Sequence, residues 1–291
     1  MTTPDFTPFT TTLSTLFSQT ATLPAADLAT AAIAATHAFY PTVAAATPDT
    51  KPIAVIRQLI DHVWAALIDQ VRADGAHNEK LADFVKLYWD GLVASAPQGC
   101  RTQDLGRYDD LDWITIDNAL GGPCEGGAAC TGEHETRDDG VYCTSDRTHS
   151  LNGSFEDRRR AWVSYVHFCA VLLARDMVNE RGVLHRATLG VFEGETAGGW
   201  DYRGSNVLAF EKALGVVGGL FWEQGGSWWE AGKGMGVQGE ELEKRWEGFA
   251  GVLEGVEGDA EGDAEEDEEV REGAGRARVL LKEIREAYGK K

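Results

Sequence analysis

The stretch FEDRRRAWVSYVHFCAVLLARDMV, at residues 155–178, decides the fold class of this chain. Its apolar residues recur at steps of three and four, which predicts an α-helix that Ser154 is placed to cap. Two neighbouring faces of this helix are apolar: Trp162, Tyr165, Cys169, Leu172 and Leu173 on one, and Val163, Val166, Ala170, Val171 and Ala174 on the other. A helix that is apolar over so wide an arc is typical of the centre of a helical protein, where it packs on several sides.

The same spacing recurs before and after this central helix. It predicts helices over 24–40, 51–73, 79–95, 109–120, 206–221 and 242–253, and an amphipathic helix at the C-terminus. In the helix over 206–221, Gly215 and Gly219 lie four residues apart and would let another helix approach closely. No convincing run of alternating residues indicates a sheet. We therefore predict an all-α fold, an irregular multi-helix bundle with a long Cys- and Gly-rich insertion and an acidic low-complexity segment before the last helix.

The distribution of turn-forming and acidic residues suggests the domain boundaries. We expect a flexible N-terminal segment over 1–23 and a helical domain over 24–253, with an inserted loop over 121–153. An acidic, Gly-rich linker over 254–275 then leads to a C-terminal helix over 276–291. The linker is expected to be disordered, because so acidic a segment contains too few apolar residues to form a core.

The charge and the N-terminal composition exclude several classes of protein. The formal net charge is -20, and the chain outside the acidic run is still acidic, so direct binding to nucleic-acid phosphates is not expected. The first 17 residues contain no Lys or Arg, which argues against secretory and organelle-targeting peptides. No apolar run has the length of a membrane helix, and five cysteines, an odd number, fit reduced thiols. We expect an intracellular protein, cytoplasmic or nuclear, that does not contact a membrane.

Three stretches in order carry a resemblance to a known family. They are RYDDLDWITIDNAL at 107–120, RRRAWVSYVHFCAVLLA at 158–174 and NVLAFEKALGVVGGLF at 206–221. The chain between Ile53 and Phe221 resembles the fungal family known as domain of unknown function 3632, in which a short helix with Trp and acids precedes an aromatic-rich helix. The resemblance implies an all-helical intracellular fold and transfers no activity or catalytic residue. The cysteine-bearing insertion departs from the family pattern.

The insertion contains the best candidate metal ligands. Cys124, Cys130, His134 and Cys143 follow the spacing C-x5-C-x3-H-x8-C, and three thiolates with one imidazole can form a tetrahedral zinc site. However, the run contains no C-x2-C pair, and its glycines and acids are typical of a flexible surface insertion with free thiols. A redox-active thiol pair or a disulfide is a third alternative. We expect no other cofactor.

Two groups on the central helix also carry reactive or charged side chains. His167 and Cys169 are two positions apart and so point to different faces, which favours structural roles for both. Arg158, Arg159 and Arg160 form a cationic spot near the start of the helix. Acids nearby could neutralise it, and the functional alternative is that it binds an anionic ligand or an acidic partner segment.

Aromatic and acidic residues gather in the glycine-rich part of the chain. The residues concerned are Trp200, Trp222, Trp228 and Trp229, with Glu193, Glu195, Asp201 and Glu230. Carbohydrate-processing sites combine such residues, but no spacing here fixes a catalytic pair, and packing of the tryptophans onto the bundle explains them more simply. The chain has no phosphate loop, nucleophile elbow or zinc-protease motif.

These observations rank three functional hypotheses, and none assigns a catalytic residue. The leading hypothesis is a non-enzymatic helical module that binds another protein. The acidic run is more simply a solvated linker, and its functional alternative is an electrostatic contact with a basic partner. The second is a small-molecule enzyme or ligand-binding protein whose pocket lies between the helices at 155–178 and 206–221, and it requires a polar group directed into that pocket. The third is that zinc stabilises the insertion at 121–145.

Overall fold

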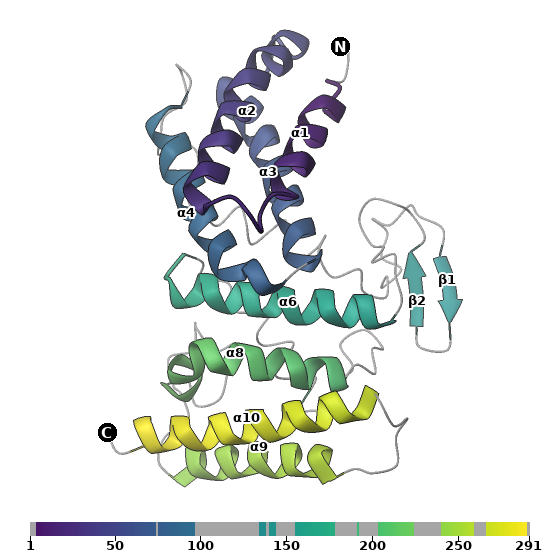
Figure 1. Ribbon diagram of the computed structural model, residues 1–291, viewed down its shortest axis with the longest axis vertical. Coiled ribbons are helices and arrows are strands. Elements are labelled where there is room, and N and C mark those ends of the chain that lie inside the picture. Colours follow the sequence, from purple (N-terminus) through teal and green to yellow (C-terminus); the bar gives the residue numbers. More distant parts are fainter. Residues whose placement is uncertain are drawn as a thin grey trace. The chain divides into compact units, whose positions relative to one another are not determined.

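The described part of the chain consists of helices and one short hairpin (Figure 1). The computed structural model describes residues 4–73, 75–96, 134–137, 140–143, 155–177, 191, 203–223, 240–258 and 266–289. The predicted all-α fold is confirmed, whereas the predicted helix over 109–120 lies outside the described residues. The chain divides into two compact units, Met1–Ala119 and Leu120–Lys291, where the sequence suggested one helical domain over 24–253.

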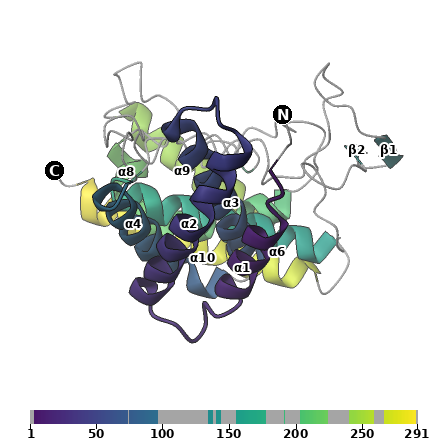
Figure 2. The same ribbon diagram turned by 90° about the horizontal axis from the view of Figure 1, so that it is seen from above.

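The described part of the first unit is made of four α-helices and one short 3-10 turn. They are α1 (Thr7–Phe17), α2 (Ala25–Ala46), α3 (Pro52–Ala73), η1 (Gly75–His77) and α4 (Asn78–Ala94). Helix α2 packs most extensively against α4, and α1 packs against both α2 and α3 (Figure 2). The apolar stripes predicted over 51–73 and 79–95 are buried in this unit, as expected for helices that share one core.

Helix α1 corrects the predicted flexible segment over 1–23. Its Phe9, Leu13, Leu16 and Phe17 recur at helical spacing, and all four side chains are buried. The stripe is easily overlooked because threonines, which have weak helix propensity, fill the positions between these residues. Burial of the apolar stripe offsets that weak propensity, so tertiary packing stabilises the helix.

Aromatic rings join the helices of the first unit. The rings of Trp64 in α3 and Tyr88 in α4 meet edge to face, with centroids 5.4 Å apart. Phe84 stacks on Tyr88 at 5.6 Å, and Phe17 of α1 meets Phe84 at 5.1 Å. Aromatic pairs in these geometries stabilise a core beyond the contribution of the buried area alone.

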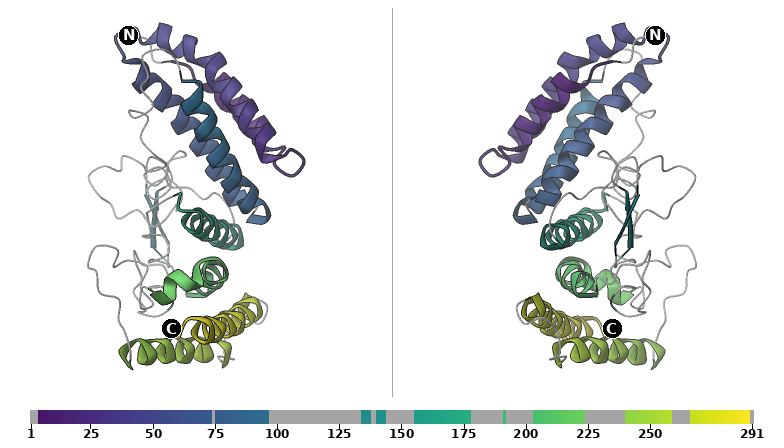
Figure 3. Two further views of the ribbon diagram at one scale, coloured as in Figure 1. Left: turned by 90° about the vertical axis from the view of Figure 1, so that its left-hand side faces the viewer. Right: turned by 90° about the vertical axis from the view of Figure 1, so that its right-hand side faces the viewer.

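The helices of the second unit follow one another in space in the order α6, α8, α10 and α9 (Figure 3). Their bounds are Phe155–Ala174 for α6, Arg203–Glu223 for α8, Glu240–Gly258 for α9 and Glu266–Tyr288 for α10. Helix α6 is the central helix that the sequence predicts over 155–178, and it ends earlier. Its last turn closes where Asp176 adopts a left-handed conformation (φ 54°) and the Met177 N–H donates to the Leu172 carbonyl at 3.0 Å.

Glycines set the contact between α8 and α10. A Cβ at Gly218 would overlap the end of the Ile284 side chain, and a Cβ at Gly219 would overlap the Tyr288 ring, so a side chain at either position would require its neighbour to move. The sequence predicted a close approach at Gly215 and Gly219. It is correct for Gly219 but wrong for Gly215, where a Cβ would have no neighbour within 4 Å. The backbone of α8 also kinks at Val217, immediately before this glycine pair.

The contacts along this interface show that α8 and α10 run parallel. Near the start of both helices, a Cβ at Gly204 would lie 2.9 Å from Val270 Cγ2, and Leu208 fills the space over Gly273. Residue numbers therefore rise together along the two helices. Helix α9 follows α8 in the sequence and leads the chain back to the start of α10. It packs along α10 on the side opposite α8.

Helices α9 and α10 correct the predicted acidic linker over 254–275. Helix α9 extends to Gly258 and α10 begins at Glu266, ahead of the predicted start at 276. The apolar stripe of α10 begins earlier than expected because small and β-branched residues continue it towards the N-terminus: Val270, Ala274, Ala277, Leu281 and Ile284 are all buried. The described acids Glu268, Glu269 and Glu272 are exposed on the other faces of the helix.

The predicted inserted loop contains a hairpin. Strand β1 (His134–Arg137) pairs antiparallel with strand β2 (Gly140–Cys143), so the insertion is not wholly irregular. Within the described segments of the chain, none of the helices is both long enough and apolar enough to cross a membrane.

Candidate functional site

The interface between α6 and α8 begins with a small group of polar side chains. Arg159 and Trp162 come from α6, and Ser205 and Asn206 come from α8; we call these four residues the α6–α8 polar cluster. Arg159 is 5% exposed and Ser205 is 2% exposed, so both are withdrawn from solvent. Sequence reasoning missed Ser205 and Asn206, because the apolar pattern of α8 starts at Val207. The available signal was the run Gly-Ser-Asn, residue types that favour helix starts.

A hydrogen bond between side chains fixes the two helices at this point. Trp162 Nε1 donates to Asn206 Oδ1 at 3.0 Å, and the bond is partly buried. An indole N–H that is removed from water requires such an acceptor. The bond holds the start of α8 against α6 and uses one acceptor position of the Asn206 amide.

The side chain of Arg159 reaches the first turn of α8. Its Nη2 atom lies 3.3 Å from the position that a Cβ on residue 204 would take, so Gly204 allows the guanidinium to come close to the backbone. Of the predicted cationic spot, Arg159 is buried and Arg160 is exposed, while the side chain of Arg158 lies outside the described residues. Arg159 and Arg160 therefore do not share one environment.

The hydroxyl of Ser205 is buried without a hydrogen bond. Its Oγ atom has neither solvent contact nor a partner within the protein. A buried polar group in this state costs about 1–3 kcal/mol, and native proteins usually satisfy such groups with a water, an ion or a ligand. The start of the α6–α8 interface is therefore polar and incompletely satisfied, whereas most other buried side chains of α6 are apolar, among them Val166, Phe168 and Val171.

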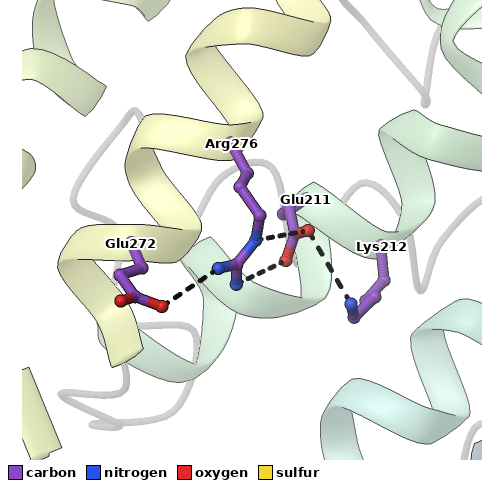
Figure 4. Close-up of polar contacts among 4 residues, drawn as sticks. All are labelled: Glu211, Lys212, Glu272 and Arg276. Atoms are coloured by element: carbon purple, nitrogen blue, oxygen red, sulfur yellow. Dashed lines mark hydrogen bonds and ion pairs between the residues drawn. The ribbon is translucent and has the colours of Figure 1, made fainter. Parts of the chain in front are cut away.

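A second charged group in this unit is satisfied within the chain (Figure 4). Glu211 of α8 is 7% exposed and accepts hydrogen bonds from Arg276 of α10, with Nε–Oε1 at 3.0 Å and Nη2–Oε2 at 3.4 Å. Glu272 and Lys212 extend the network at 3.4 Å and 3.7 Å. The hydrogen bond to Glu211 raises the pKa of Arg276 above its ordinary value. This network pairs α8 with α10 and does not require a ligand.

A histidine and a serine meet in the first unit. His37 Nε2 of α2 lies 2.9 Å from the Oγ of Ser95, which follows α4. The hydroxyl of Ser95 donates to the Gly91 carbonyl at 2.7 Å, so its proton is directed away from the imidazole. An activated nucleophile would give that proton to the histidine, so this pair links α2 to α4 and is not arranged for catalysis.

The structure places two of the four predicted zinc ligands opposite each other. The hairpin register pairs His134 with Cys143 at the open end of β1 and β2. Cys124 and Cys130 lie outside the described residues. Within the described ranges, no group of three or more potential ligand side chains is close enough to hold a metal. The four-ligand zinc site stays a prediction.

Two other residues that the sequence singles out, Cys169 and Trp222, are buried among the helices. Cys169 is buried at 9% exposed, as its place on the apolar stripe indicates, and His167 is half-buried. Trp222 is 9% exposed and packs edge to face on Trp246, with ring centroids 4.7 Å apart, which confirms the expected packing of this tryptophan. The other tryptophans of that group and their four accompanying acids lie outside the described residues.

Comparisons with known proteins add no family assignment. No family model, no curated protein and no solved structure matches the chain. The resemblance to domain of unknown function 3632 stays a prediction.

Proposed function

We propose that this protein binds a small ligand between α6 and α8, at the α6–α8 polar cluster. The observation that carries the proposal is the Ser205 hydroxyl, which is buried without a partner beside a buried arginine. A ligand pocket between these two helices is an alternative that the sequence suggests, on condition that a polar group is directed into it. Arg159 and Ser205 both supply polar groups at that interface.

The cost of the buried Ser205 hydroxyl supports a binding role over a purely structural one. Ser205 contributes no side-chain hydrogen bond to the fold, so its hydroxyl destabilises the unliganded chain. A ligand that accepts a hydrogen bond from this hydroxyl would offset that cost when it binds.

The chemistry of the cluster favours binding rather than catalysis. Its four members are an arginine, a tryptophan, a serine and an asparagine, none of which is a general base near neutral pH. We therefore propose a ligand-binding protein and assign no reaction. The protein-binding role and zinc at residues 124, 130, 134 and 143 stay predictions.

The indole N–H groups of two tryptophans provide a test. Trp162 Nε1 bonds Asn206 within the cluster, whereas Trp246 Nε1 bonds the Leu281 carbonyl at 2.8 Å, between α9 and α10. A panel of acetate, inorganic phosphate, glucose and imidazole would be titrated into the ¹⁵N-labelled chain, with the Trp162 signal assigned by Trp162→Phe. We expect at least one molecule to shift the Trp162 resonance and leave the Trp246 resonance in place. A panel that leaves both signals unchanged would contradict the proposal.

A further inference from the structure

The two halves of helix α9 differ in what holds them in place. The half over 240–247 contains no glycine, has three acids in its first turn and is anchored by Trp246. Trp246 is 2% exposed, its Nε1 donates to the Leu281 carbonyl of α10 at 2.8 Å, and its ring packs edge to face on Trp222 of α8. Acids in a first turn are stabilised by the positive end of the helix dipole. The first half of α9 is therefore firmly held.

The half over 248–258 has the opposite properties. It contains four glycines at which a Cβ would meet no atom within 4 Å: Gly248, Gly251, Gly255 and Gly258. No close neighbour requires these glycines, and each lowers the equilibrium constant for helix formation by about fivefold relative to alanine. The structure describes every residue of this half, and among them only Leu253 is buried. The second half of α9 is therefore weak as a helix and weakly packed.

Ion pairs with Arg278 of α10 hold this weak half. Arg278 Nη2 lies 2.7 Å from Glu257 Oε2, and Arg278 Nη1 lies 3.6 Å from Glu254 Oε1. Both acids lie near the negative end of the α9 dipole, where the last turn has no base, so by themselves they destabilise the helix. Arg278 offsets this repulsion. Its side chain is 39% exposed, so dissolved salt can screen both ion pairs.

We infer that residues 248–258 form a flap that opens while the rest of the second unit stays folded, and that Arg278 latches the flap closed. Segments with few buried side chains and solvent-exposed polar contacts open more readily than the core of the same protein. Because Trp246 stays anchored, the opening begins after it and uncovers Leu253, which is 0% exposed in the closed form. The open flap presents an apolar surface that the closed protein hides. The opening does not require the proposed ligand.

Hydrogen exchange of the full chain would measure the opening. We expect the amides of 248–258 to exchange at least about tenfold faster than those of 207–214 in α8, whose side chains are mostly buried. Raising sodium chloride to about 0.5 M should increase that ratio, because salt screens the ion pairs of Arg278. Flap amides that exchange as slowly as those of α8 would refute the opening.

Two alanine substitutions separate local opening from unfolding of the whole unit. Gly251→Ala strengthens the flap itself, so it should slow exchange over 248–258 by about fivefold. Gly215→Ala, at an equally open position in α8, stabilises the unit only against global unfolding and should leave flap exchange within about twofold. If Gly215→Ala slows flap exchange as much as Gly251→Ala does, the flap opens only when the whole unit unfolds, and the inference is overturned.

Arg278→Gln tests the latch. We expect it to speed flap exchange by about threefold or more, because both ion pairs with α9 are lost, and to leave exchange over 240–247 within about twofold. Lys282→Gln is the matched control, since it removes the same charge from an exposed position of α10. Equal flap exchange in the two variants would show that Arg278 is not the latch.

Discussion

The ring cluster of the first unit and the α8–α10 interface of the second unit pack their helices in opposite ways. In the first unit, large rings fill the space between helices, with Trp64, Phe84 and Tyr88 almost fully buried. In the second unit, α8 and α10 come together where side chains are missing, at Gly218 and Gly219 among others. The first arrangement gains stability from buried volume, and the second gains it from close backbone approach.

The difference predicts opposite sensitivities to substitution. A core filled by rings is damaged when a side chain becomes smaller, because a cavity remains. An interface built on glycines is damaged when a side chain becomes larger, because the buried side chain opposite must leave its packed position. Not every glycine of the second unit belongs to such an interface, since Gly215, Gly248, Gly251 and Gly255 have open space at the Cβ position.

The largest effect is expected for Trp64→Ala in the first unit. Trp64 is 0% exposed, and we expect a loss of about 3–5 kcal/mol in the free energy of unfolding, the range for removing a buried aromatic side chain. Urea unfolding would measure the loss, and hydrogen exchange would show it in peptides of α3 and α4. Leu87→Ala, at a residue that is 41% exposed, is the control and should change stability by less than about 0.5 kcal/mol. A loss below about 1 kcal/mol for Trp64→Ala would show that this core is not tightly packed.

The second largest effect is expected for a substitution at the glycine interface between α8 and α10. A control substitution lies in the same helix. Gly219→Ala places a methyl group against Tyr288, and we expect a loss of about 2 kcal/mol. Gly215→Ala has open space and should instead stabilise α8 by about 1 kcal/mol, since alanine is the better helix former. Thermal unfolding of the two variants side by side gives the comparison. If both substitutions stabilise the protein, α8 and α10 do not meet through Gly219.

The buried ion pair predicts a rescue by a second substitution. Arg276→Leu leaves the Glu211 carboxylate buried without its main partner, and we expect a loss of about 1–2 kcal/mol. The double variant Glu211→Leu with Arg276→Leu should recover most of that loss, because the buried charge is gone. Urea unfolding of the single variants and the double variant would give the coupling energy. Additive losses in the double variant would argue against a direct pair.

Helix α9 should become more stable when its open glycines are replaced. A Cβ at Gly255 meets no atom within 4 Å, and we expect Gly255→Ala to raise the free energy of unfolding by about 0.5–1 kcal/mol. The change would be measured by chemical denaturation, with exchange of α9 amides as the local readout. A destabilising result would reveal a close neighbour at this position.

The smallest effect concerns pH and the first unit. His62 is half-buried and its ring packs on Phe6, with centroids 4.3 Å apart; burial lowers the pKa of His62 below its ordinary 6.5. The unfolded chain therefore binds the proton more readily, so the stability present above pH 6.5 is lost as the pH falls through the lower pKa of the folded state. The difference in unfolding free energy between the chain and His62→Phe, measured from pH 7.5 to pH 5, should shift in favour of the variant. A constant difference would contradict the lowered pKa.

Local patterns account for what the sequence predicts well. The apolar stripes that become α3, α4 and α6 are visible because helical periodicity depends only on residues within a few turns. Helix α1 is less evident, because threonines lower its local propensity and its stability comes from packing against α2 and α3. The hairpin has a weaker local signal, because the Gly140 of the turn-favouring dipeptide Asp139-Gly140 is already the first residue of β2, where it pairs with Arg137.

By itself, the sequence determined that this protein is all-α and which apolar stripes form its cores. Only the tertiary structure decided which of two similar residues in the sequence is buried or packed against another helix. It buries Arg159 and exposes Arg160, and it places Tyr288 over Gly219 while leaving space at Gly215. The reason is physical, because the environment of a residue depends on which distant segment packs against it, and no short-range pattern encodes that choice. The unpartnered hydroxyl of Ser205, on which the proposed function rests, arises in the same way from the packing of α8 in the second unit.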